Sequence, residues 1–290
     1  MAQRAALIGL PNTGKSISRK FIFNGERAFV ISPSSKMTHL FTSEGKTKAK
    51  DMLHFPEGGK PVSQLDFTIN GVPVADFMKK NNIQSIHEAV KGMVTNPHSF
   101  KIEATGNYIV CSEVKYVEYY QTFISRFMPS INMIFLADFT HWVSYILRSP
   151  SFRKQTSGGG AFERFWTLAA DTLDNIILAA DTLRDDIIVY TEYHAEYHQD
   201  TDTYRVFVPA GNMLNDKFLP KSYYDICLHT EITPYEEEQD DSKRYKFVVK
   251  NLGRKDGRGM DLFNDIEEKG MIPNNIEVVD SRIRKYFLSK

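Results

Sequence analysis

The sequence predicts an α/β fold in which helices flank a mostly parallel sheet. The chain opens with a short apolar segment, Ala5 to Ile8, that leads through a glycine-bounded loop into an amphipathic stretch, Ile17 to Phe23. Further apolar segments alternate with stretches of helical periodicity, which is typical of β-α-β units. With 290 residues, 42% of them hydrophobic, the chain is long enough to bury a large core.

The loop after the first strand has the Walker A spacing, in which two glycines enclose four residues and precede a lysine and a serine. Such a loop binds phosphates through its backbone N–H groups, while the lysine reaches the terminal phosphates and the serine hydroxyl binds Mg²⁺. The alternative is a glycine-rich turn without a ligand, but the flanking strand and helix favour a phosphate site. The predicted nucleotide-binding residues are Gly9, Pro11, Asn12, Thr13, Gly14, Lys15, Ser16 and Ile17. We expect Lys15 to face solvent when no ligand is bound.

The next elements complete a β-α-β opening and then interrupt it. Residues 27–31 predict a second strand. Residues 36–98 lose clear periodicity among prolines and glycines, and we interpret the part from about 51 to 98 as a β-rich insertion. Within it, Asn70-Gly71 predicts a hairpin turn. Ser85, followed three residues later by Glu88, predicts the start of a helix that runs to Val94.

Two later strands end near acidic residues. Residues 108–111 form an apolar segment that is followed by Glu113 and then by a predicted helix with an apolar face. Residues 131–136 form a second apolar segment, which leads to Asp138. A buried parallel strand can place an acid beside the phosphate loop, so Asp138 is predicted to hold Mg²⁺ together with Ser16. The alternative is that Asp138 only caps the next helix.

Residues 148–160 form a glycine-containing loop with the cations Arg148, Arg153 and Lys154. A long helix is predicted from about Ala161 to Leu183, and then a buried strand over 187–194 that carries Glu192 and His194. Because working groups of open α/β sheets lie at the carboxyl ends of the strands, we expect both side chains near Asp138.

His194, Glu196 and His198 suggest a metal site. We favour a role for His194 in sensing phosphate or orienting water, because no third histidine is nearby in the sequence.

The C-terminal part predicts strands at 204–208, 224–229 and 245–250 and a glycine-rich basic loop. We divide the chain into a core over 1–235 and an extension over 236–290, in which a strand, the basic loop and a helical tail pack on the core. The loop is either simply solvated or reaches the nucleotide of a neighbouring subunit. Its cations are Lys250, Arg254, Lys255 and Arg258.

Composition limits the choice of partners and compartment. Lys plus Arg equal Asp plus Glu at 36 each, so any contact with nucleic acid must come from local patches. Two cysteines are too few for a disulfide framework, and both lie in apolar segments typical of buried thiols. No apolar run approaches the length of a membrane span, and the N-terminus lacks a signal-peptide core. We therefore expect a cytoplasmic protein without a membrane partner.

In order and spacing, these elements resemble the ATPase core of RecA-like ASCE P-loop proteins, and most closely the phage-type Sak group of single-strand annealing and recombination ATPases. The resemblance covers roughly residues 3 to 260, and its specific motif is GLPNTGKS. It implies a hydrolase that uses ATP and Mg²⁺, acts in phage DNA recombination or replication in the host cytoplasm, and assembles as a ring or filament on single-stranded DNA. An annealing or replication protein is a further partner that it implies.

The resemblance also implies roles for particular segments. DNA-contacting loops fall at 148–160 and 195–215, although Asp200 and Asp202 in the second loop repel phosphate. A basic residue acting on the adjacent subunit's ATP falls among Lys250, Arg254, Lys255 and Arg258. His194 would report loss of the γ-phosphate to the DNA-facing loop.

The position of the catalytic glutamate departs from the family pattern. RecA-like enzymes carry it at the end of a strand beside the strand of the magnesium-binding acid, but the second strand here ends at Ser32 without an acid. Glu113 is then the first candidate for activating water, and Glu192 is the second.

Two other classes remain as alternatives. One is an ATPase of phage assembly, genome packaging or helicase loading, although a packaging motor usually carries a nuclease domain for which 290 residues leave little room. The other is a nucleotide kinase, against which the absence of a lysine-rich lid argues.

Overall fold

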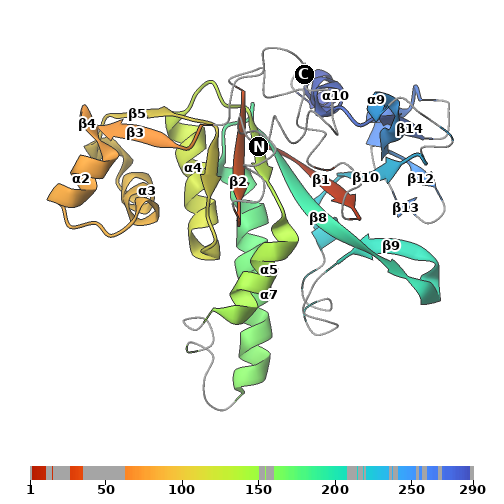
Figure 1. Cartoon of the computed structure of the whole chain (residues 1–290), viewed down its shortest axis with the longest axis horizontal. Coiled ribbons are helices and arrows are strands. Elements are labelled where there is room, and N and C mark those ends of the chain that lie inside the picture. The colour runs from red at the N-terminus through yellow and green to blue at the C-terminus, as the bar shows by residue number, and fades with distance from the viewer. Residues whose placement is uncertain are drawn as a thin grey trace.

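The computed structural model describes residues 2–10, 15, 27–34, 63–149, 154, 160–207, 214, 218, 220–234, 237, 241–252, 255–256, 260–266 and 270–287. Within them the chain forms an α/β fold whose sheet is mixed and mostly parallel and is flanked by helices, as the sequence predicts (Figure 1). The helix expected at 17–23 lies outside the described residues.

The central sheet does not follow the order of the chain. From one edge to the other its strands run β14-β11-β10-β1-β8-β7-β2-β6. β1 pairs in parallel with both β10 and β8, and β7 pairs in parallel with both β8 and β2. Near one edge, β11 pairs in antiparallel fashion with both β10 and β14. The bounds are β1 Gln3–Gly9, β2 Ala28–Ser32, β6 Tyr108–Val110, β7 Met133–Leu136, β8 Ile188–His198, β10 Ile226–Ile232, β11 Tyr245–Val248 and β14 Met271–Pro273.

Helices cover both faces of this sheet. Successive side chains of a strand point to opposite faces, so Ala6 and Ile8 of β1 join one hydrophobic core while Ala5 and Leu7 join the other. The first core includes apolar residues of three helices, and the second includes apolar residues of the C-terminal helix. The three helices are α4 (Val117–Phe127), α5 (Phe139–Arg148) and α7 (Ala161–Leu178), and the fourth is α10 (Ile276–Phe287).

A small module with a three-stranded sheet of its own carries the described part of the expected insertion, and its buried residues share the hydrophobic core of α4 (Figure 1). It confirms the predicted hairpin, since Asn70 and Gly71 both have positive φ angles of 54° and 79°. It also confirms the predicted helix start, because the Ser85 side chain accepts a hydrogen bond from the Glu88 backbone N–H. Its third strand lies beyond residue 98. The elements are β3 (Asp66–Ile69), β4 (Val72–Pro73), α2 (Val74–Lys80), α3 (Ile86–Thr95) and β5 (Ile102–Thr105).

The strand predicted to end at His194 is longer than expected. β8 continues to His198 and there pairs in antiparallel fashion with β9 (Thr203–Val206). The first part of the expected loop at 195–215 is therefore a two-stranded ribbon that projects from the sheet (Figure 1). Within this part of β8, Ala195 is buried, Glu196 and His198 are half-buried, and Tyr197 is exposed.

A buried carboxylate links the C-terminal helix α10 to the core. Other short C-terminal elements are α9 (Asp241–Arg244), β12 (Asn251–Leu252) and β13 (Lys255–Asp256). Asp280 of α10 is 3% exposed and accepts hydrogen bonds from Arg27 Nη2 at 2.7 Å and from Arg284 Nε at 2.8 Å. Arg284 also donates to the backbone oxygens of Asp186 and Asn132, so one cluster joins α10 to the segments before β7 and β8.

Replacing Asp280 by alanine is expected to lower the free energy of unfolding by about 3 kcal/mol, because removing one partner of a buried ion pair leaves the other charge uncompensated. We take the lower end of the usual range since the Arg27 side chain is 48% exposed. Urea unfolding with an unchanged m value measures the loss.

The matched control for this change is Asp265→Ala, which removes the exposed partner of Arg282. It should leave the urea midpoint almost unchanged, because solvent screens exposed ion pairs. An Asp280→Ala midpoint as high as that of the control would contradict the assignment.

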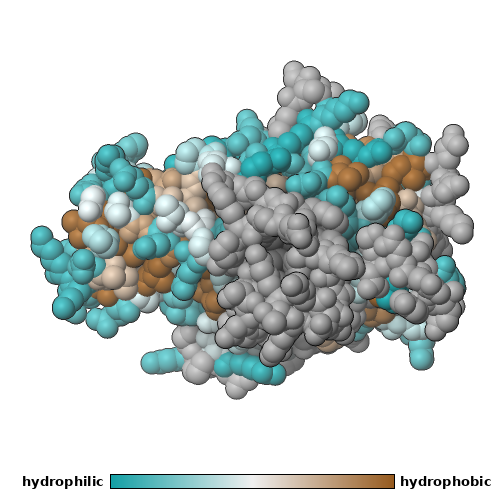
Figure 2. All heavy atoms as spheres, turned by 45° about the horizontal axis from the view of Figure 1, so that its top comes forward, coloured by the Kyte–Doolittle hydropathy of each residue, from teal (hydrophilic) through white to brown (hydrophobic). Residues whose placement is uncertain are grey.

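Hydrophilic residues are interspersed with hydrophobic ones over the face shown in Figure 2. None of the helices in the described part of the chain has the length and apolar character needed to cross a bilayer. The two cysteines, Cys111 and Cys227, are both buried, as predicted.

Candidate functional site

Strands β1 and β7 end at the same edge of the sheet, where β8 continues into the ribbon with β9. β8 lies between β1 and β7, with Gly9 in register with His194 and Leu136 in register with Thr191. The loop after β1, the acid after β7 and the polar end of β8 therefore meet at one place, as the sequence predicts for Asp138, Glu192 and His194. Carboxyl ends of neighbouring parallel strands are where ligands bind in open α/β sheets.

The glycine-bounded loop follows β1, and beyond Leu10 the structure describes Lys15 of this loop. Its Nζ donates to the backbone oxygens of Gly9 at 2.7 Å and of Leu10 at 2.8 Å, and the residue is 7% exposed. The expectation that Lys15 faces solvent is wrong, because the amine folds back onto the end of its own strand. The other residues predicted to bind the nucleotide lie outside the described residues: Pro11, Asn12, Thr13, Gly14, Ser16 and Ile17.

Two carboxylates influence the Lys15 amine. Burial lowers the pKa of Lys15 from its ordinary value, while the charges of Glu192 and Asp138 raise it. Glu192 is 0% exposed and lies in register with Leu7, on the face of β8 that also carries Tyr190. Glu192 and Asp138 are thus both close enough to Lys15 to favour the charged form of its amine.

Asp138 lies at a sharp turn from strand to helix. Its φ of 52° is left-handed, a conformation that aspartate tolerates better than most residues, and its backbone oxygen accepts from the His141 N–H at 2.8 Å. Asp138 is the first residue before α5, but its side chain makes no capping hydrogen bond there. The carboxylate is instead directed toward His194, whose Nε2 lies 3.4 Å from Asp138 Oδ1.

Glu113 has different surroundings. β2 separates β6 from β7, so the strand that precedes Glu113 is not beside the one that ends at Asp138. The Glu113 side chain is 53% exposed and pairs with Lys115 Nζ at 3.1 Å. The residues that follow it, Val114 and Tyr116, pack in the core opposite to the one that contains Leu7 and Tyr190.

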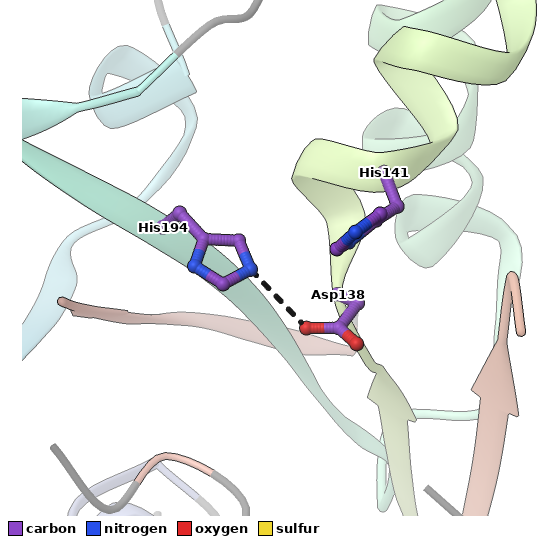
Figure 3. A group of neighbouring side chains, drawn as sticks. All are labelled: Asp138, His141 and His194. Atoms are coloured by element: carbon purple, nitrogen blue, oxygen red, sulfur yellow. Dashed lines mark ion pairs between the residues drawn. The ribbon is translucent and has the colours of Figure 1, made fainter. Parts of the chain in front are cut away.

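A second histidine joins the site. Asp138 and His141 come from the beginning of α5 and His194 comes from β8, and the three side chains converge (Figure 3). One ligand atom from each lies within 4.8 Å of the others. Sequence reasoning missed His141 because it considered only neighbours of His194 along the chain. The available signal was its position only three residues after Asp138, in the first turn of the helix that follows.

Glu196 and His198, which the sequence suggests as metal ligands together with His194, lie on the β8–β9 ribbon. Glu196 is in register with Arg205 and His198 with Thr203. In the part of the chain that the structure describes, the group with metal-ligand spacing contains His194 but neither Glu196 nor His198.

The predicted DNA-binding residues are only partly described. Arg148 is exposed at the end of α5 and lines a cavity of about 410 Å³ with Glu113, Lys115 and Tyr145. Lys154 is exposed, and Arg153 lies outside the described residues.

The basic residues expected to act on a neighbouring subunit are likewise only partly described. Lys250 Nζ donates to the Ile266 backbone oxygen at 2.9 Å, and Lys255 belongs to β13. Arg254 and Arg258 lie outside the described residues.

Comparison with known proteins leaves the site to be interpreted from its geometry. No protein-family model matches the chain. A search of curated proteins finds no match either.

Proposed function

We propose that this chain is a RecA-like P-loop ATPase that binds Mg-ATP and acts on single-stranded DNA as an oligomer in phage recombination or replication. The observation that carries the proposal is the placement of Lys15 near both Asp138 and Glu192 at the shared edge of β1, β8 and β7. Phosphoryl transfer to water needs a cation for the phosphates, an acid for the metal and a group that positions the nucleophile. These three residue types meet here.

Lys15 would bind the β- and γ-phosphate oxygens of ATP. In the structure its amine is held by two backbone oxygens, which phosphate oxygens would replace. Asp138 would hold Mg²⁺ together with Ser16. The carboxylate fits this role because Mg²⁺ prefers oxygen ligands and because Asp138 lies near Lys15. When bound, Mg²⁺ neutralises charge on the phosphates.

Glu192 is our candidate for positioning the attacking water. In RecA-like enzymes the catalytic glutamate lies on a strand beside the acid-bearing strand, and β8 is adjacent to β7 whereas β6 is not. Glu192 also acts electrostatically on Lys15, while the Glu113 carboxylate pairs with Lys115. We therefore rank Glu192 above Glu113, the reverse of the order that the sequence suggests.

His194 would sense the state of the nucleotide. It lies in register with Gly9, its ring approaches Asp138, and its strand continues into the β8–β9 ribbon. A change in its contacts on loss of the γ-phosphate would reach the ribbon through one continuous strand.

Single-stranded DNA is expected to bind the wild-type protein in a salt-sensitive manner and to raise its ATPase rate. The logarithm of the affinity should fall by about 0.7 per contacted phosphate for each tenfold rise in salt. Replacing Arg148, Arg153 and Lys154 together by alanine should lower both the affinity and this slope, because these cations neutralise the backbone. Fluorescence anisotropy at several salt concentrations and the ATPase rate with and without DNA measure both effects.

The matched control removes the same charge from exposed lysines of the small module. The triple alanine variant of Lys79, Lys80 and Lys101 should keep the wild-type affinity and salt slope. If the wild type binds no single strands at low salt, even with a non-hydrolysable nucleotide, the recombination role falls and an assembly ATPase or a kinase becomes the better proposal. Mass measurement with and without ATP tests the oligomer.

A further inference from the structure

One imidazole and one carboxylate already lie at the separation that a metal ion imposes, and a second imidazole lies close by. With bonds of 2.0–2.2 Å, two ligand atoms of a tetrahedral site lie about 3.3–3.6 Å apart. His194 Nε2 and Asp138 Oδ1 are 3.4 Å apart. The rings of His141 and His194 have their centroids 5.6 Å apart at an angle of 72°, and one ligand atom from each of the three residues lies within 4.8 Å of the others (Figure 3).

The backbone holds these three residues in fixed positions. The His194 N–H donates to Thr140 Oγ1 at 3.0 Å, and Thr140 is 5% exposed. This bond ties the end of β8 to the first turn of α5, on which His141 lies directly after Thr140. The His141 N–H donates to the Asp138 backbone oxygen at 2.8 Å. A ligand set whose backbone is ordered before binding loses little entropy when an ion enters.

The donor types select the class of ion. Imidazole nitrogens suit zinc, copper, iron, cobalt and nickel, whereas Mg²⁺ prefers oxygen and gives up its water reluctantly. Asp138 and His194 have side chains that are 15% and 21% exposed, which leaves a route for an ion from solvent. Among the described residues the cluster has three ligand groups, and three protein ligands with a free position are typical of zinc sites that bind water or substrate.

We propose that Asp138, His141 and His194 bind a divalent transition-metal ion of the zinc or cobalt class, with a free coordination position for water or a phosphate oxygen. The inference goes beyond the proposed ATPase, with which it shares Asp138. It concerns binding in the absence of nucleotide, so the failure of one proposal would not entail the failure of the other.

The test is a Co²⁺ titration of the untagged full-length protein without nucleotide. A single ion per chain should bind and give visible d–d absorption bands, and Zn²⁺ should abolish the bands by displacing Co²⁺. His141→Ala should weaken Co²⁺ binding by more than about 100-fold, because loss of a direct ligand exceeds the 10- to 100-fold cost of losing an outer-shell partner. His98→Ala, which removes an exposed histidine of the small module, should bind Co²⁺ like the wild type.

Three results would overturn the proposal. The first is a wild-type protein that gives no Co²⁺ bands, and the second is a His141→Ala variant that binds Co²⁺ like the His98 control. The third is displacement of Co²⁺ by an equal concentration of Mg²⁺, which would identify a plain magnesium site. His141→Asn, which keeps a polar side chain, should show the same loss as His141→Ala, and circular dichroism establishes that each variant is folded.

Discussion

Replacing Lys15 by alanine is expected to lower kcat/KM for ATP by at least about 100- to 1,000-fold, the effect of removing one preorganised group that stabilises developing charge. The amine already lies at the end of β1, bonded to Gly9 and Leu10, so it needs only to exchange two backbone oxygens for phosphate oxygens. Steady-state hydrolysis and nucleotide affinity should both be measured, since Lys15 acts in binding as well as in the chemical step.

Because Lys15 is buried, the variant also needs a measurement of folding. Removing the amine takes a positive charge away from Glu192 and Asp138, so a lower stability is expected together with the lower activity. Lys80→Ala, at an exposed position of α2, is the control and should hydrolyse ATP like the wild type. Hydrolysis near the wild-type rate in a folded Lys15→Ala protein would refute the phosphate-loop assignment.

Replacing Glu192 by glutamine is expected to slow ATP hydrolysis by about 100- to 10,000-fold while ATP stays bound, because a general base acts only in the chemical step. Glutamine keeps the shape of the buried side chain, so the change removes charge and basicity without creating a cavity. Single-turnover kinetics, with nucleotide binding measured in parallel, separate the two effects.

Glu113→Gln provides the matched comparison for Glu192→Gln. Its carboxylate is half exposed and pairs with Lys115, and this variant should hydrolyse ATP at close to the wild-type rate. A larger loss at Glu113 than at Glu192 would restore the ranking that the sequence suggests and would place the catalytic glutamate on the segment after β6.

Local patterns were enough to predict the elements that carry the site. The apolar runs before Gly9 and Asp138 form β1 and β7, and Ser85 begins α3, because strand burial and helix capping depend on residues close together in the chain. The approach of Glu192 and His194 to Asp138 also followed from a general rule for parallel sheets.

Features that depend on distant residues could not be predicted in this way. The strand order, with β8 between β1 and β7 and with β2 between β7 and β6, depends on long-range pairing that has no local signal, and it separates the surroundings of Glu192 from those of Glu113. The burial of Lys15 depends on the end of its own strand and on carboxylates far along the chain. His141 did have a local signal, its spacing from Asp138, but its meaning depends on the arrival of His194 from β8.

The length of β8 gives the site a mechanical property. The strand is uninterrupted from Ile188 in the core, past His194, to His198, and beyond the sheet it is stiffened by pairing with β9 (Figure 1). At about 3.3 Å per residue, the four steps from His194 to His198 form a lever arm of about 13 Å. A tilt of about 10° with its pivot at His194 would displace the far end of the arm by about 2 Å. Small angular changes beside Gly9 and Asp138 would thus become a translation at the far end of the β8–β9 ribbon.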